Sequence, residues 1–299
     1  TLLLTDPTIR PIDETTVNGA NNTEVKYTVV VLFNGTVVGK ANKTVPVLYN
    51  GYLGKDLEYN ATYIENINSY TVNSYMIMPD SYYPDISYMS ANDTNKTVVW
   101  DLSDFREHIF VKMFLYIPYN WDKSGVDGPV FNTTFNGNEI APKFKYRDQS
   151  NLGEYGSYGY GLYVYDVTDL VQKDNNTFVL NKEPGLTAVY PTYLFELYNF
   201  TDSSMIMDIT LLEGVDLISN DYNDAGRIVK TDSQVEVSKG EHSFLEIFAA
   251  GAEEDDYNVI INGEAYPQEW YGTSESLSHF SAEVPAGLNN VSVVATGSP

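Results

Sequence analysis

The amino-acid sequence predicts an all-β protein built from tandem β-sandwich modules of the jelly-roll or immunoglobulin-like type. Runs of β-branched and aromatic residues recur along the chain, and Asn-Gly pairs join several of them. No window combines helical periodicity with capping residues. The chain has 299 residues, 43% of them hydrophobic and 25 of them tyrosine, which is ample apolar surface for folded cores.

The first fifty residues predict a β-hairpin. Two β-branched runs, residues 25–33 and 36–39, flank Asn34-Gly35, which is the strongest short-range hairpin signal. Residues 45–49 predict a third strand. Because so short a stretch seldom buries its own core, we assign residues 1–50 to a partial immunoglobulin-like module or to a β arm packed on its neighbour.

The strongest single strand prediction covers residues 108–117. Its alternation places one set of residues on one face and a largely aromatic set on the other, and a strand that is apolar on both faces belongs in the middle of a sandwich. The first set is Ile109, Val111, Met113, Leu115 and Ile117, and the second is His108, Phe110, Lys112, Phe114 and Tyr116.

Two further modules follow the arm. Residues 51–224 predict a larger jelly-roll-like sandwich, and the turn-rich cluster at 220–226 separates it from a smaller sandwich over residues 225–299. Other predicted strands are 74–78, 131–135, 162–171, 175–180, 188–197, 205–212, 234–237, 243–249, 257–261, 279–284 and 291–295.

An internal repeat relates the two sandwiches. The Asn-Gly segment 136–142 is echoed by 262–267, and the Asn-Asn segment 174–179 is echoed by 288–293. This alignment places Asn175 opposite Asn289. The order of hairpin, variable loop, strand, Asn-Asn turn and closing strand therefore occurs twice.

Composition excludes several classes of function. The net charge of -24, with only 17 Lys and Arg, argues against nucleic acid and against anionic lipid. The absence of cysteine excludes disulfides and thiolate sites. No apolar run of about twenty residues predicts a membrane span. Residues 1–5 are too short and lack the basic flank of a signal peptide, so the chain resembles a mature or excised piece of a larger protein.

Asn-x-Ser/Thr triplets, the acceptor motif for N-glycosylation, occur ten times. So many triplets beside predicted turns favour an extracellular, glycosylated surface, and compositional bias toward Asn and Thr is the alternative. The acceptor asparagines are Asn21, Asn34, Asn42, Asn60, Asn92, Asn95, Asn132, Asn175, Asn199 and Asn290.

No catalytic constellation is present, so we predict that the protein is not an enzyme. The three histidines, His108, His242 and His279, have no metal-ligand spacing. The Gly-rich stretch 153–159 lacks the Gly-x-Ser-x-Gly register of a hydrolase nucleophile. Pairs of carboxylates have little specificity in so acidic a chain.

Calcium is the one possible cofactor. Two turns cluster oxygen ligands of the kind that hard cations require, and neither matches an EF-hand. The alternative is that Asp and Asn simply favour turns. The candidate ligands are Asp122, Asp127, Asp221 and Asp224.

Aromatic residues near one predicted loop are the candidates for binding. They predict either a stacking platform for sugar rings or a contact with another subunit. The candidates are Tyr155, Tyr158, Tyr160, Tyr119, Trp121 and Trp270. The Gly- and Tyr-rich loop 155–160 differs between the two repeats, and variable loops on a repeated scaffold are where contacts are made.

Two resemblances rest on these motifs. The order of Asn-Gly hairpin, residues 166–171 and residues 175–180 resembles galactose-binding-like jelly-roll domains. Over about 48–296, residues 155–157, 165–168 and 212–217 resemble a domain of unknown function in large adhesin-like surface proteins of methanogenic archaea, although Val215 replaces the usual Ala of a Gly-Ala-Asp form. This resemblance implies a secreted cell-surface protein of stacked β-domains.

The sequence therefore predicts a non-catalytic structural or adhesive protein at the cell surface. Such a protein builds a surface layer or filament, or mediates attachment, and its partners are neighbouring copies, other surface proteins or glycans. A carbohydrate-binding module that uses the Tyr and Trp side chains is the alternative.

Overall fold

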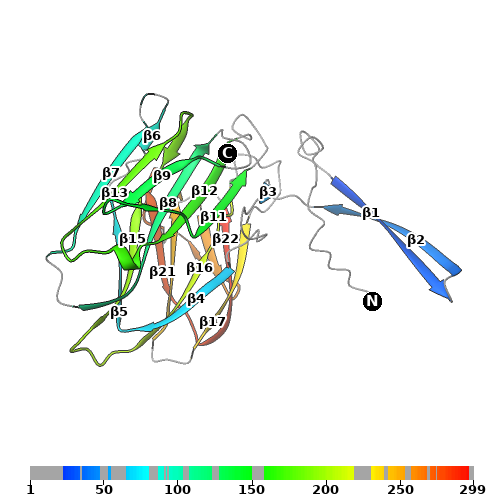
Figure 1. The fold of residues 1–299 in the computed structure, drawn as a ribbon. Coiled ribbons are helices and arrows are strands. Elements are labelled where there is room, and N and C mark those ends of the chain that lie inside the picture. The colour runs from blue at the N-terminus through cyan, green and yellow to red at the C-terminus, as the bar shows by residue number, and fades with distance from the viewer. Residues whose placement is uncertain are drawn as a thin grey trace.

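In the computed structural model the described residues form β-strands joined by turns, with no α-helix, which confirms the predicted all-β class (Figure 1). The described residues are 23–33, 36–47, 53–54, 65–80, 87–90, 92, 94–103, 108–122, 128–149, 158–218, 230–238, 242–252, 257–267, 270–273 and 275–295. Their only helical element is the 3-10 turn η2 (Thr168–Leu170). None of these residues forms a helix long and apolar enough to cross a bilayer.

The larger sandwich is organised around the fifteen-residue strand β8 (His108–Asp122). Its sheet runs in the order β3 (Leu53–Gly54), β11 (Phe144–Gln149), β12 (Gly159–Asp166), β8, β14 (Thr187–Val189) and β6 (Ser87–Met89). Strand β15 (Tyr193–Phe200) also pairs with β8 and carries β5 (Ser74–Pro79) on its other edge. We call this the central sheet.

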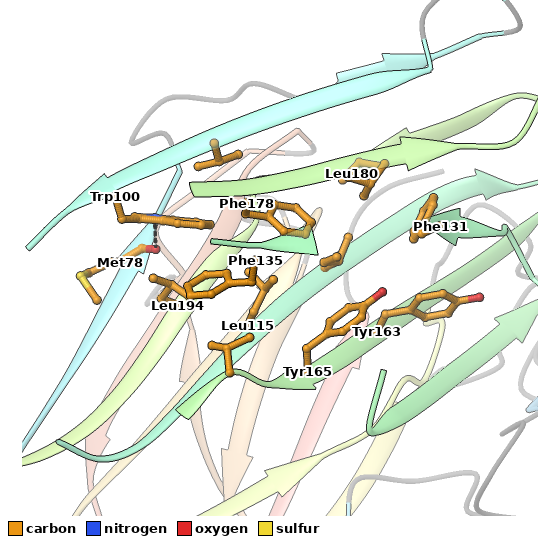
Figure 2. Packing of buried hydrophobic residues seen from close by; sticks show 14 of the residues in the cluster. Met78, Trp100, Leu115, Phe131, Phe135, Tyr163, Tyr165, Phe178, Leu180 and Leu194 are labelled. Atoms are coloured by element: carbon orange, nitrogen blue, oxygen red, sulfur yellow. Dashed lines mark hydrogen bonds between the residues drawn. The ribbon is translucent and has the colours of Figure 1, made fainter. Parts of the chain in front are cut away.

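A second sheet covers one face of the central sheet. It runs in the order β10 (Asn138–Ile140), β9 (Phe131–Phe135), β13 (Asn175–Lys182) and β7 (Asn95–Asp101). The first core lies between the two sheets, where Phe135, Phe178, Leu115 and Leu194 are fully buried (Figure 2). The indole N–H of Trp100 donates to the backbone carbonyl of Met78 at 3.1 Å, which satisfies the one polar atom of that ring.

The other face of the central sheet is also buried. Strands β4 (Glu65–Val72) and β16 (Met207–Glu213) pair with each other, and their partly buried residues Tyr70 and Ile209 pack on this face. The second core contains Phe114, Tyr116 and Phe195. The prediction from β8 of a strand apolar on both faces is therefore confirmed.

A β-bulge corrects the predicted face assignment at the start of β8. From Met113 onward the predicted alternation holds. Leu197 pairs with Lys112 but Tyr198 pairs with Phe110, so Val111 is an extra residue in the ladder. As a result Phe110 packs against the first core and Val111 against the second, the reverse of the expected sides.

The smaller sandwich repeats part of the larger one. Its four-stranded sheet has the order β17 (Lys230–Val237), β22 (Gly287–Ala295), β19 (Tyr257–Ile261) and β20 (Glu264–Pro267), matching β7, β13, β9 and β10. Strand β18 (Phe244–Ala250) pairs with β21 (Leu277–Glu283) as β8 pairs with β12. Trp270 and Phe280 fill the third core. The predicted repeat thus has the same strand order in both sandwiches.

An asparagine clasp joins hairpin to central strand in each copy. Asn136 has φ 50°, its Nδ2 donates to Asn176 Oδ1 at 2.9 Å, and its Oδ1 accepts from the Thr177 N–H at 2.8 Å. In the smaller sandwich Asn262 has φ 52° and makes the same bonds to Asn289 and to the backbone N–H of the next residue, at 2.8 and 3.0 Å.

The clasps shift the repeat alignment by one residue. Asn176, not Asn175, is the counterpart of Asn289, because both are buried and both cap the preceding turn with Nδ2. Phe178 then corresponds to Val291, and both side chains are buried. The predicted alignment is therefore wrong by one position.

Replacing Asn136 with alanine is expected to lower the free energy of unfolding by about 1–3 kcal/mol, because the Thr177 N–H loses its acceptor and Asn176 Oδ1 loses one of its two donors. The Asn136→Gly variant is the matched control, because it also lacks the side chain but adopts the left-handed backbone without strain. Urea denaturation measures the free energy of unfolding of both variants. Equal stability of Asn136→Ala and the parent protein would contradict the clasp.

Other predicted elements are partly correct. Strands β1 (Thr23–Phe33) and β2 (Thr36–Val47) form the predicted hairpin, which stands apart from the sandwiches in Figure 1. No separate strand begins at residue 45, because β2 runs unbroken to Val47. The predicted strand 188–197 is two strands, β14 and β15. The proposed boundary at residues 224–225 lies outside the described residues.

The two sandwiches meet through a short segment after β16. Ile218 packs with Ala295 of β22, and its carbonyl accepts a hydrogen bond from the Tyr257 hydroxyl at 3.2 Å. The Leu217 N–H donates to Asp148 of β11 at 2.7 Å. Leu277, at the start of β21, packs against the second core. This segment, residues 213–218, is called the junction segment below.

Candidate functional site

Three aromatic rings meet at the end of β8. Trp121 lies between Tyr88 of β6 and Tyr158, with ring centroids 6.0 Å from each. Tyr88 is 49% exposed, whereas Trp121 and Tyr158 are partly buried. We call these three residues the Trp121 cluster. It presents aromatic surface to solvent on a rigid sheet.

The backbone at Trp121 explains where its ring lies. Gly159 pairs with Asp122 and Gly161 pairs with Tyr119, so the ladder between β12 and β8 is irregular at residues 120–121. Trp121 has φ 56°, in the left-handed region that bulky residues rarely adopt. Such strain costs about 1–3 kcal/mol and is typical of binding and active sites.

Polar groups surround the Trp121 cluster. Asn120 donates through Nδ2 to the hydroxyl of the buried Tyr190 at 2.7 Å. The Tyr88 hydroxyl donates to Glu275 of the smaller sandwich at 3.4 Å. Burial raises the pKa of the Tyr190 hydroxyl, and the neighbouring Tyr160 adds to this effect. The Tyr190 hydroxyl therefore stays protonated. The cluster therefore lies where the two sandwiches approach each other, with hydrogen-bonding groups from both.

A buried ion pair lies next to the Trp121 cluster, at the residue that follows Trp121. Arg147 Nη1 lies 2.5 Å from Asp122 Oδ2, and both side chains are almost fully buried. A Cβ on Gly159 would overlap the Arg147 guanidinium, and Gly128, at φ +74°, lies against the same group and the Tyr119 hydroxyl. Small residues are therefore required where the guanidinium passes between the strands.

The structure brings together only part of the predicted aromatic set. Trp121 and Tyr158 are in contact, and Tyr160 lies near Tyr190. Two residues correct the prediction: Tyr119 and Trp270 are each only 1% exposed, because Tyr119 packs edge-on against Tyr163 and Trp270 packs in the third core. Tyr155 lies outside the described residues.

Sequence reasoning missed Tyr88, Tyr190 and Glu275. Tyr88 reaches the cluster because β6 pairs with β14, where Tyr88 lies opposite Ala188. That pairing spans a hundred residues and has no local signal. In a chain with 25 tyrosines, residue type alone also does not select these two.

The calcium candidates have little support. Asp122 is bound to Arg147 and fully buried, so its charge is already neutralised and it does not offer an open ligand. Asp127, Asp221 and Asp224 lie outside the described residues. Within the part of the chain that the structure describes, no three His, Cys, Asp or Glu side chains come close enough to hold a metal ion.

The described acceptor asparagines differ in exposure. Asn92, Asn95, Asn132, Asn175 and Asn290 are exposed, whereas Asn199 is partly buried. Asn42 lies in β2, for whose side chains nothing is described. Asn21, Asn34 and Asn60 lie outside the described residues.

One histidine forms a buried pair. His108 Nε2 lies 2.7 Å from Glu196 Oε1, and the imidazole packs against Phe110 and Tyr198 with centroids 4.6 and 4.7 Å away. Burial raises the pKa of Glu196. Both side chains are at most 8% exposed, so the pair faces the interior of the sandwich.

The comparisons with known proteins bear on this architecture. A family model described as "Protein of unknown function (DUF3344)" matches residues 51–297. No curated protein matches the chain.

Two solved structures are similar to the chain at low identity. Dimeric latent PorU from Porphyromonas gingivalis shares 15% identity over 78% of this chain and 21% of that one, with a TM-score of 0.30. Streptomyces avermitilis alpha-L-rhamnosidase complexed with L-rhamnose shares 13% identity over 92% and 29%, with a TM-score of 0.22. The chain thus spans less than a third of either structure.

Proposed function

The chain belongs to the DUF3344 family, and we propose that this member is a non-catalytic, extracellular structural or adhesive glycoprotein of the cell surface. It contacts neighbouring copies, other surface proteins or glycans through the Trp121 cluster. The proposal includes an archaeal surface layer or filament, which rests on the resemblance of residues 48–296 to adhesin-like proteins. The acidic, cysteine-free composition suits a protein kept soluble by charge repulsion.

The strained backbone of Trp121 is the observation that carries the proposal. A left-handed conformation at a bulky residue persists only where the surrounding structure enforces it. Here a partly buried ring packs on Ala188 and Tyr190 beside the half-exposed Tyr88, and Trp and Tyr supply much of the energy of protein interfaces.

A carbohydrate-binding role is the second candidate. The faces of sugar rings stack on aromatic side chains, and their hydroxyls need fixed hydrogen-bonding groups beside the stack. The exposed Glu275 supplies such a group next to Tyr88. The two candidates differ in their ligand, not in the residues that bind it.

Replacing Trp121 with alanine is expected to weaken binding by about 30-fold or more, because truncating an interface anchor typically costs 2 kcal/mol or more. A glycan array and a cell-adhesion assay identify the ligand, and analytical ultracentrifugation tests self-association. Phe248→Ala, in the smaller sandwich, is the matched aromatic control. Unchanged adhesion, self-association and glycan binding in Trp121→Ala would refute the proposal.

A further inference from the structure

The outer face of the sheet β10-β9-β13-β7 differs from the rest of this acidic chain. Its outward side chains on the three longer strands are almost all uncharged, although the chain has 41 Asp and Glu. Asp101 is the exception. The outward residues are Asn95, Thr97, Val99 and Asp101 on β7, Asn132 and Thr134 on β9, and Asn175, Thr177, Val179 and Asn181 on β13. We call this surface the sequon face.

Strand geometry aligns three glycosylation motifs on the sequon face. Residues i and i+2 of a strand point the same way, so the Asn and the Thr of each motif face outward together. Asn181 pairs with both Asn95 and Asn132, which places these two acceptors in one row on alternate strands. At about 4.8 Å per strand they lie about 10 Å apart. Asn175 is the third acceptor, on the strand between them.

We propose that the sequon face is N-glycosylated at Asn95, Asn132 and Asn175 and is thereby closed to contacts with other proteins. The inference rests on the proposed extracellular location. It adds that contacts are directed to the Trp121 cluster, whose residues Tyr88 and Trp121 belong to the central sheet and not to the sequon face.

The physical reason is the composition of the face and its open edge. Val99 is 56% exposed on β7, which is an edge strand of this sheet, and a nearly uncharged sheet face beside an open edge favours association with other sheets. Linked glycans cover that surface. Asn95 Nδ2 donates to Asn181 Oδ1 at 2.7 Å, and a glycosylated amide keeps one N–H for this bond.

Asn199 provides an internal contrast. It lies partly buried near the end of β15, and its Oδ1 accepts the Asn73 N–H at 2.8 Å. The Asn73 side chain accepts the Phe200 N–H through Oδ1 at 2.8 Å and donates through Nδ2 to the Phe200 carbonyl at 2.9 Å. This partly buried side chain is less accessible to the modifying enzyme than the three exposed acceptors, so Asn199 is expected to be unmodified.

Glycopeptide mass spectrometry of the protein purified from its native cells tests the inference. We expect glycans on Asn95, Asn132 and Asn175 and none on Asn199. Thr97→Ala, Thr134→Ala and Thr177→Ala each remove one acceptor motif while keeping the asparagine, and each is expected to lose one glycan. The matched Thr→Ser variants keep the motif and the glycan.

Two results separate this inference from the proposed function. The triple Thr→Ala variant should keep ligand binding and gain self-association, whereas Trp121→Ala should lose binding and keep its glycans. Unmodified asparagine at two or more of the three positions overturns the glycosylated face, even if Trp121→Ala loses binding. A glycosylated Asn199 overturns the geometric argument.

Discussion

Replacing Asp122 with alanine is expected to destabilise the protein by about 3–5 kcal/mol, the usual cost of removing one partner of a buried ion pair. The Arg147 guanidinium would remain buried at 1% exposure with its charge unpaired. No charged replacement lies within the described contacts of the guanidinium. The loss should appear as a lower midpoint in guanidinium denaturation.

Two controls make this test specific. The double variant Asp122→Leu with Arg147→Met removes both charges and should recover most of the stability, because apolar replacements of buried pairs are often neutral. Asp101→Ala, at an exposed carboxylate, should leave the denaturation midpoint nearly unchanged. A double variant as unstable as Asp122→Ala would show that packing, and not the uncompensated charge, causes the loss.

The second large effect is a loss of stability as pH rises. Burial, with a contribution from the nearby Asp232, raises the pKa of Asp216 from 3.8 to about 7. Between these pH values the folded protein holds a proton that the unfolded chain has lost. The free energy of unfolding is therefore unaffected by this group below about pH 4. It falls between about pH 4 and about pH 7, by at most about 4 kcal/mol in total.

The Asp216→Asn variant should remove this slope. Chemical denaturation between about pH 4 and about pH 8 is expected to show a flatter profile and a gain in stability at the alkaline end. Burial also raises the pKa values of Glu196 and Glu213, so part of the slope remains in the variant. Parallel profiles for the variant and the parent would contradict the assignment to Asp216.

The location of Asp216 gives this pH dependence a structural meaning. It belongs to the junction segment, between Glu213, which accepts a hydrogen bond from Tyr116 in the second core, and Leu217, which bonds Asp148. Ionisation of Asp216 therefore weakens the segment that ties one sandwich to the other.

Local sequence patterns predicted much of the fold. Alternating runs identified β8, β13, β19 and β21, and each Asn-Gly pair with described residues lies in a tight turn with positive φ. These signals are reliable because they depend on nearest neighbours. The aromatic content of both faces of β8 also predicted its central position correctly.

The errors arise where long-range pairing decides. The bulge at Val111 and the irregular ladder at Trp121 come from the register of β8 against β15 and β12, and one displaced residue exchanges the faces. Likewise, two adjacent asparagines in each repeat are chemically identical, and only the clasp selects Asn176 and Asn289. Burial of Tyr119 and Trp270 follows from partners far away in sequence.

The position of β22 in its sheet also constrains how the smaller sandwich assembles. Strand β22 is the last strand of the described chain, yet it lies between β17 and β19 and pairs with both. Until residues 287–295 have been synthesised and inserted, these two strands keep unpaired edges toward each other. A nascent chain therefore exposes aggregation-prone strand edges until β22 closes the sheet, as β13 does for the larger sandwich.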